Sequence, residues 1–334
     1  MLVAHLMAMR RLSYVLLVAG TSACSTAEYA APIKVFSDST DAAAKSVREL
    51  NASLAKATLD YIVEVAARDP ANNHLEVPET DCGAFLPTGV SSEAVRCRAS
   101  IKLKSGLGQE VTVEREHYTD PLGNMVAIMD AIKDYANNLA AVQEDNTAAE
   151  VNDSIDSIQA SLIELMKAAG KNEPPSDLPK AAGEAVKWVF GQYIDTVKYR
   201  ALRDATAAAE EPLALAAGAF RKIDETVKVE LSAPSGAEAF DKRDNMNPRD
   251  ETSIREALAA QNAYDDVLTA PLSSMFDNLV AAHHDLAEAL AGTKPLSVRT
   301  ALAKLKEVEK QAQALGKIAN DLNAALKEEA PPSS

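Results

Sequence analysis

Histidine and carboxylate side chains around residue 284 are the first candidates for metal binding or catalysis in this sequence. His284 and Glu288 stand four residues apart in a predicted helix, so they share one face and offer two ligands to a metal ion. The neighbouring His283 points about 100° away from His284 on an ideal helix and continues the apolar positions Leu279 and Leu286. We therefore predict that His283 is a core histidine with a hydrogen-bond partner. We predict no metal site, because two ligands on one helix are ordinary surface chemistry; His284 and Glu288 would be the candidate ligands if a metal were bound.

The motifs of common enzymes are absent from the chain. It has no His-Glu-x-x-His metal motif, no Gly-x-Ser-x-Gly nucleophile turn and no phosphate-binding loop ending in Gly-Lys-Ser or Gly-Lys-Thr. Adjacent acids such as Glu210 and Glu211 lie in charged helical segments, which favours a solvated helix face. We accordingly expect no catalytic residue and no cofactor.

Composition favours packed helices as the scaffold for these residues. The 334 residues are 47% hydrophobic and 25% charged but only 4% aromatic, and alanine and leucine dominate. Apolar residues recur in steps of three and four along most of the chain, as in amphipathic helices. The predicted fold is an all-α, elongated antiparallel bundle of about five long helices with one small β-hairpin insertion.

Prolines, glycines and capping residues set the predicted boundaries. After a signal peptide at 1–23 and a tether at 24–37, we expect one helical domain over 38–327, with an insertion at 70–120 and a flexible tail at 328–334. The second helical stretch should shift phase or break near Asp145, where Thr147 to Glu150 resembles a capping box. Pro212 should kink or restart the third stretch, Pro271 should bend the fourth, and 232–245 should form a polar connection. The predicted helical ranges are 38–69, 120–169, 180–231, 247–290 and 296–327.

The insertion contains the one clear alternation of apolar and polar residues. Segments 98–104 and 110–116 alternate around a glycine-containing turn, which predicts a β-hairpin. Pairing Lys104 with Glu110 also pairs Leu103 with Val111, Ile101 with Val113 and Arg98 with Glu116. Apolar residues then oppose each other on one face of the hairpin, and opposite charges oppose each other on the other face. Because loops on a rigid scaffold often carry binding, the hairpin is a candidate interaction surface, although a structural cap over the end of the bundle explains it equally well. Its candidate residues are Lys102, Lys104, Leu107, Glu110 and Glu114.

The N-terminal residues are typical of an export signal. Arg10 and Arg11 precede the apolar run 12–19, and small residues then lead to Cys24. This arrangement resembles the signal of bacterial lipoproteins, with Thr21 standing where that family has a larger aliphatic residue. The resemblance covers only residues 9–24 and implies lipidation of Cys24; a plain cleaved signal peptide is the alternative. In a Gram-negative host, Ser25 after the cysteine implies an outer-membrane protein that faces the periplasm.

Export bears on the other two cysteines. If Cys24 is acylated, Cys82 and Cys97 remain as one pair in a compartment where disulfides persist. We predict that they are bridged, with a pair of buried thiols as the alternative. Closing this loop would stabilise the fold by roughly 3 kcal/mol in the chain-entropy model.

The charge balance limits the classes of partner. The chain has 34 basic and 49 acidic residues and a formal charge of −15. Nucleic acids and anionic lipid headgroups would be repelled, so the lipid on Cys24 would provide membrane binding. The expected partners are the membrane, through that lipid, and another envelope protein.

Together these patterns predict a lipid-anchored cell-envelope protein that acts as a non-catalytic adaptor, inhibitor or assembly factor. The first alternative is a ligand- or metal-binding bundle, or an enzyme, with a site assembled around His284 and Glu288. The second alternative is a passive structural spacer.

Overall fold

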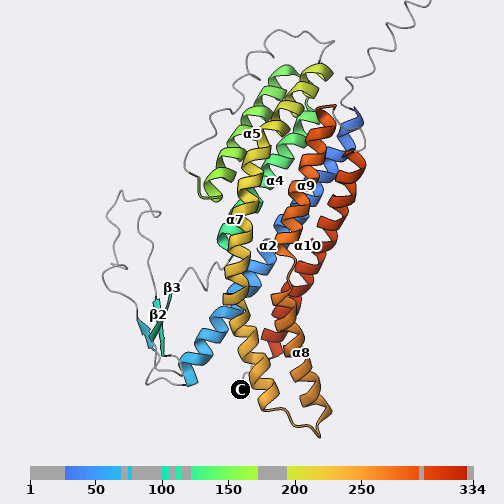
Figure 1. Cartoon of the computed structure of the whole chain (residues 1–334). Coiled ribbons are helices and arrows are strands. Elements are labelled where there is room, and N and C mark those ends of the chain that lie inside the picture. Colours follow the sequence, from blue (N-terminus) through green and yellow to red (C-terminus); the bar gives the residue numbers. More distant parts are fainter. Residues whose placement is uncertain are drawn as a thin grey trace, which may run out of the picture. The chain divides into compact units, whose positions relative to one another are not determined.

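A computed structural model describes residues 27–68, 74–76, 100–104, 110–114, 122–171, 194–292 and 297–328 of the chain. These residues form a helical bundle of seven helices with a short sheet inserted after the first helix (Figure 1). In the described ranges, no helix combines the length and the apolar character needed to cross a bilayer. The helices are α2 (Ala27–Arg68), α4 (Gly123–Glu144), α5 (Ala148–Ala168), α7 (Ile194–Asp244), α8 (Glu251–Leu268), α9 (Leu272–Leu290) and α10 (Ser297–Glu328).

Helix α2 begins eleven residues earlier than its sequence pattern predicts. The tether expected at 24–37 is wrong from Ala27 onward, because the chain is helical there and buries Ile33 and Phe36. Pro32 lies inside α2 near its start, where a helix tolerates a missing amide hydrogen better than in its middle. The buried positions then continue in steps of three and four through Thr40, Ala43, Val47, Leu50 and Leu54.

The predicted break near Asp145 is present and separates α4 from α5. Thr147 caps α5: its hydroxyl accepts a hydrogen bond from the Glu150 amide at 3.2 Å, and the Glu150 carboxylate accepts one from the Thr147 amide at 2.9 Å. This reciprocal pair is the predicted capping box. A second break at Pro271 separates α8 from α9, so the described chain has seven helices where five regions were expected.

Helix α7 is continuous over 51 residues, so a restart at Pro212 and a connection at 232–245 are both wrong. It passes Pro212 without interruption, and it runs through most of the segment 232–245 that was expected to be a connection. Pro212 is itself buried, with Ala209 and Leu213 buried on either side of it. We attribute the continuity to this packing, which compensates for the backbone hydrogen bond that proline cannot make.

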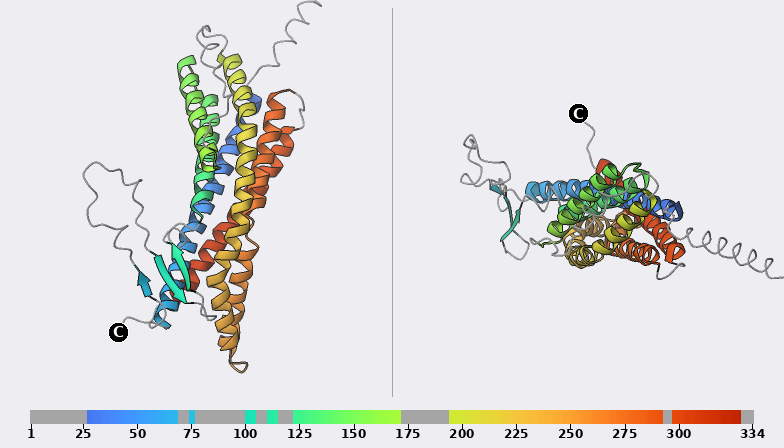
Figure 2. Two further views of the ribbon diagram at one scale, coloured as in Figure 1. Left: turned by 60° about the vertical axis from the view of Figure 1, so that its left-hand side comes forward. Right: turned by 90° about the horizontal axis from the view of Figure 1, so that it is seen from above.

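The insertion contains a three-stranded antiparallel sheet in the order β1 (His74–Glu76), β2 (Ser100–Lys104), β3 (Glu110–Glu114). Its backbone register pairs Lys104 with Glu110, Leu103 with Val111 and Ile101 with Val113, as predicted. Figure 2 shows β2 and β3 beside each other. β1 adds a strand that the sequence did not indicate and pairs Leu75 with Ile101. The expected pair of Arg98 with Glu116 lies outside the described residues.

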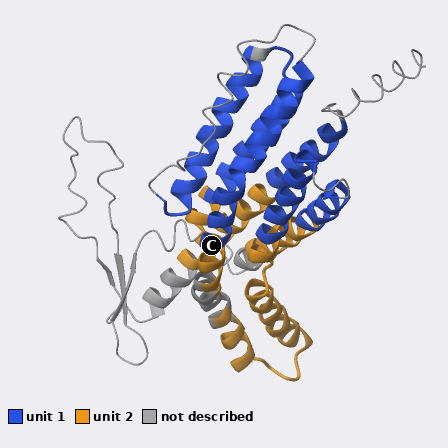
Figure 3. Cartoon of the chain, turned by 45° about the horizontal axis from the view of Figure 1, so that its top comes forward, with its two compact units in different colours: residues 1–42, 128–219, 276–309 blue, residues 43–127, 220–275, 310–334 orange. Residues whose placement is uncertain are grey.

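The chain divides into two compact units that share several helices (Figure 3). Unit 1 comprises residues 1–42, 128–219 and 276–309, and unit 2 comprises residues 43–127, 220–275 and 310–334. Each unit buries its own large apolar side chains. That residues 38–327 form a single domain stays a prediction. The core of unit 1 includes Ile33, Phe36, Met129, Ile132, Tyr135, Leu202, Phe276 and Leu279, and that of unit 2 includes Leu50, Leu54, Leu122, Met125, Phe220, Leu272, Met275 and Leu315.

Candidate functional site

Three helices of unit 1 bring a tyrosine, a glutamate and two histidines together. Tyr135 comes from α4, Glu210 from α7, and His283 and His284 from α9. His283 follows the buried positions Phe276 and Leu279 of α9 at helical spacing and is only 1% exposed. The prediction that His283 is a core histidine is therefore confirmed.

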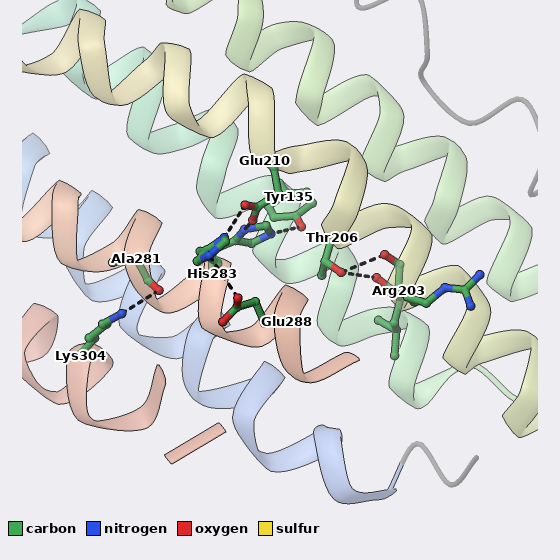
Figure 4. A network of polar contacts seen from close by, with 10 residues as sticks. Tyr135, Arg203, Thr206, Glu210, Ala281, His283, Glu288 and Lys304 are labelled. Carbon is green, nitrogen blue, oxygen red and sulfur yellow. Dashed lines mark hydrogen bonds and ion pairs between the residues drawn. The ribbon is translucent and has the colours of Figure 1, made fainter. Parts of the chain in front are cut away.

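His283 forms hydrogen bonds through both of its ring nitrogens (Figure 4). Its Nδ1 lies 3.0 Å from Oε1 of Glu210, and its Nε2 lies 2.7 Å from the Tyr135 hydroxyl oxygen. Because an ionised carboxylate only accepts hydrogen bonds, Nδ1 carries the proton toward Glu210. In a neutral ring, Nε2 then accepts the hydrogen bond that the Tyr135 hydroxyl donates.

Glu210 extends this chain of contacts to the surface. Its second carboxylate oxygen, Oε2, accepts a hydrogen bond from Nδ1 of His284 at 2.6 Å. On the other side of that ring, Nε2 lies 3.7 Å from Oε1 of Glu288. The His284 side chain is 55% exposed and that of Glu210 is 38% exposed, so this half of the cluster contacts solvent.

Phe36 packs against the buried half of the cluster. Its ring centroid lies 5.7 Å from that of His283 and 6.5 Å from that of Tyr135, the latter in an edge-on arrangement. The three rings come from α2, α9 and α4, so one aromatic contact links three helices of unit 1. This packing holds the His283 ring in the orientation that both hydrogen bonds require.

The electrostatics of the cluster follow from burial and from these hydrogen bonds. Burial raises the pKa of the Tyr135 hydroxyl well above its ordinary value, and the negative charge of Glu210 adds to that rise. For Glu210, burial alone would raise the pKa of the carboxyl, but hydrogen bonds from His283 and His284 outweigh it and lower the pKa. At neutral pH the cluster therefore contains a neutral tyrosine and an ionised glutamate.

The inner part of the cluster is suited to positioning helices. The Tyr135 side chain is fully buried and its hydroxyl faces His283, so it has no path to a substrate in the described structure. A buried hydrogen bond ties α9 to α4, and a partly buried one ties α9 to α7. The outer part of the cluster, on Glu210, His284 and Glu288, reaches the surface.

The sequence identified part of this site. It paired His284 with Glu288, and the structure places them side by side. It missed Glu210, which was expected on a solvated face but contacts both histidines. One signal was available, since Glu210 lies four residues after the buried Thr206 and three before the buried Leu213, beside the apolar stripe of α7.

The residues predicted for the insertion are placed less completely. Lys102, Lys104, Glu110 and Glu114 lie in β2 and β3. Leu107, together with Cys24, Cys82 and Cys97, lies outside the described residues.

A second surface feature occurs in unit 2, where α7 and α8 run side by side. Phe240 on α7 and Leu258 on α8 are each 59% exposed. An ion pair between Lys242 and Glu256 at 3.5 Å places the two apolar side chains at the same level of the helix pair. The Arg243 guanidinium stacks over the Phe240 ring, 4.3 Å from its centroid. Two large apolar side chains with charged neighbours, one on each helix, are thus exposed in unit 2.

Among the described residues, no group of three or more histidine, cysteine, aspartate or glutamate side chains could hold a metal ion. Comparison of the chain with models of protein families, with curated proteins and with solved structures finds no match in any of the three.

Proposed function

We propose that this protein is a lipid-anchored component of a bacterial cell envelope that binds another envelope protein without catalysing a reaction. Its role would be that of an adaptor, an inhibitor or an assembly factor. The Cys24 lipid would anchor it to the outer membrane on the periplasmic side. The exposure of Phe240 and of Leu258 is the observation that carries the binding role.

The chemistry of this pair favours a protein partner. Leaving two large apolar side chains in water costs free energy that a partner surface could recover, and protein interfaces combine an apolar centre with a polar rim. Charged residues of both signs surround the pair, including Lys242 with Glu256 and Arg243 with Asp244. A net charge of −15 disfavours nucleic acid, anionic lipid and a second copy of the same chain. The partner that fits has an apolar patch of its own and is not strongly acidic.

The hairpin in the insertion is a second surface within the same proposal. An elongated antiparallel bundle would present Lys102, Lys104, Leu107, Glu110 and Glu114 on strands held by a Cys82–Cys97 disulfide. Strand β3 pairs with β2 on one side, and its other edge has no strand partner among the described residues. Such an edge can accept an extended segment of a partner.

Crosslinking in intact cells tests the proposal and separates the two surfaces. A photoreactive amino acid replaces Arg255, which lies three residues before Leu258 on α8, and the covalent products are identified by mass spectrometry. We compare the wild-type surface with the double variant Phe240→Ser, Leu258→Ser and with a chain that lacks residues 98–116. Ala259→Ser, at an exposed position beside Leu258, serves as the matched control.

We expect one defined product that persists in Ala259→Ser and is lost from the double variant while its melting temperature stays unchanged. A product lost only when residues 98–116 are removed would move the binding surface to the hairpin. If every variant gives the same products, or no product forms, the interaction role is wrong and the spacer alternative takes its place.

A further inference from the structure

His284 and Glu288 face each other through two atoms that both carry electron pairs. The Nδ1–H group of His284 donates to Glu210, so in the neutral ring Nε2 has a lone pair and no proton. That Nε2 lies 3.7 Å from Oε1 of Glu288, too far for a hydrogen bond. A cation placed between these two atoms would contact the nitrogen lone pair and the carboxylate oxygen at once.

The spacing of the two atoms suits a bound metal ion. Zinc binds imidazole nitrogen and carboxylate oxygen at about 2.0–2.2 Å, which sets two tetrahedral ligands about 3.4 Å apart. The observed 3.7 Å needs only a small adjustment of the Glu288 side chain. One imidazole and one carboxylate favour a first-row transition metal over calcium or magnesium, which prefer sites made of oxygen alone.

The neighbours of the pair resemble the outer shell of a metal site. Metal-bound histidines almost always donate their second N–H group to a carboxylate or a carbonyl, and His284 donates to Glu210 at 2.6 Å. Glu210 is in turn held by the buried His283 at 3.0 Å. The other oxygen of Glu288 lies 3.5 Å from the hydroxyl of the buried Ser297, at the limit of a hydrogen bond. Both candidate ligands are thus oriented by side chains from α7 and α10.

We propose that Nε2 of His284 and Oε1 of Glu288 bind a divalent transition-metal ion, with Glu210 fixing the orientation of the histidine ring. Two protein ligands leave the remaining coordination positions to water or to a partner's side chain, so affinity for the ion alone is modest. The site lies in unit 1 and is independent of the binding role proposed for unit 2.

A zinc titration followed by NMR tests the proposal at single-residue resolution. The full chain is labelled at the Cε1–H groups of its five histidines, and the His284 signal is assigned with the variant His284→Asn. We expect Zn²⁺ at constant neutral pH to shift or broaden the His284 signal before that of His283. Melting curves of each variant confirm that it is folded.

Three glutamate variants separate the roles of the neighbours. Glu288→Gln should abolish the zinc-dependent shift, because it replaces the ligand and keeps the shape of the side chain. Glu210→Gln should weaken zinc binding by about 10- to 100-fold, the usual effect of losing such an outer-shell contact. Glu211→Gln, next to Glu210 but exposed, is the matched control and should bind zinc as the wild type does.

Two results would overturn the proposal. One is zinc binding at His284 that is unchanged in Glu288→Gln. The other is a His284 signal that responds to acid but not to millimolar zinc, which would show that a proton provides the charge between the two side chains.

Discussion

At the scale of single residues, the buried hydrogen bond between Tyr135 and His283 should contribute to the stability of unit 1. Both side chains are buried, and the hydroxyl hydrogen bond at 2.7 Å satisfies Nε2 of the histidine. Tyr135→Phe would leave that nitrogen buried without a partner in the described structure, which costs about 1–3 kcal/mol. Urea denaturation would measure the loss.

Tyr199→Phe provides the comparison for this prediction. The Tyr199 hydroxyl donates to the carbonyl of Leu290 at 2.5 Å, but Tyr199 is partly exposed, so water can replace the lost bond. We expect a smaller loss of stability than for Tyr135→Phe. If the two variants lose the same free energy of unfolding, the hydrogen bond from Tyr135 to His283 stabilises the protein no more than the partly exposed bond of Tyr199 does.

Tyr135 also makes stability depend on alkaline pH. Burial raises the pKa of its hydroxyl well above the ordinary value of 10.0, so the unfolded chain releases this proton at a lower pH than the folded chain does. The stability that the protonated Tyr135 hydroxyl contributes to the folded state is fully present below pH 10. It is lost as pH rises from there toward the raised pKa. Thermal melts between pH 9 and 11 should therefore show a steeper decline for the wild type than for Tyr135→Phe.

At the scale of elements, α7 offers two glycines in different surroundings. An added Cβ at Gly218 meets nothing within 4 Å, whereas at Gly236 it would lie 3.1 Å from Cε2 of Tyr264 on α8. Alanine favours a helix over glycine by about 0.8–1.0 kcal/mol. We expect Gly218→Ala to stabilise the protein by up to that amount, as measured by thermal and urea denaturation.

Gly236→Ala should stabilise the protein less than Gly218→Ala does, or not at all. The reason is that Tyr264 must move by a few tenths of an ångström to admit the new methyl group. The comparison tests whether close contact with α8 explains why α7 stays helical through the predicted connection at 232–245. Equal stabilisation by the two substitutions would argue against that explanation.

At the scale of the whole molecule, the acidic charge makes the predicted lipid decisive for membrane attachment. A chain of net charge −15 and pI about 4.9 is repelled by anionic headgroups, so its surface provides no electrostatic attraction to them. Cys24→Ser should therefore move the exported protein from the membrane fraction to the soluble periplasmic fraction, as followed by immunoblotting. A protein that stays with the membrane would contradict lipidation as the anchor.

Local patterns in the sequence were sufficient for several features. The capping box of Thr147 and Glu150, the register of β2 and β3, and the burial of His283 all follow from residues that lie close together in the chain. Each depends on backbone hydrogen bonding or on helical and strand periodicity, which nearby residues specify.

Tertiary structure decided the remainder, because packing can outweigh local preference. Pro212 is compatible with a continuous helix here because buried neighbours compensate for a lost backbone hydrogen bond, and Pro32 because it lies near the start of α2. Glu210 joined the site because α7 packs against α9, a contact between residues 73 positions apart that no local pattern encodes. The sequence by itself determined helical character and charge, whereas the fold determined which distant carboxylate faces which histidine.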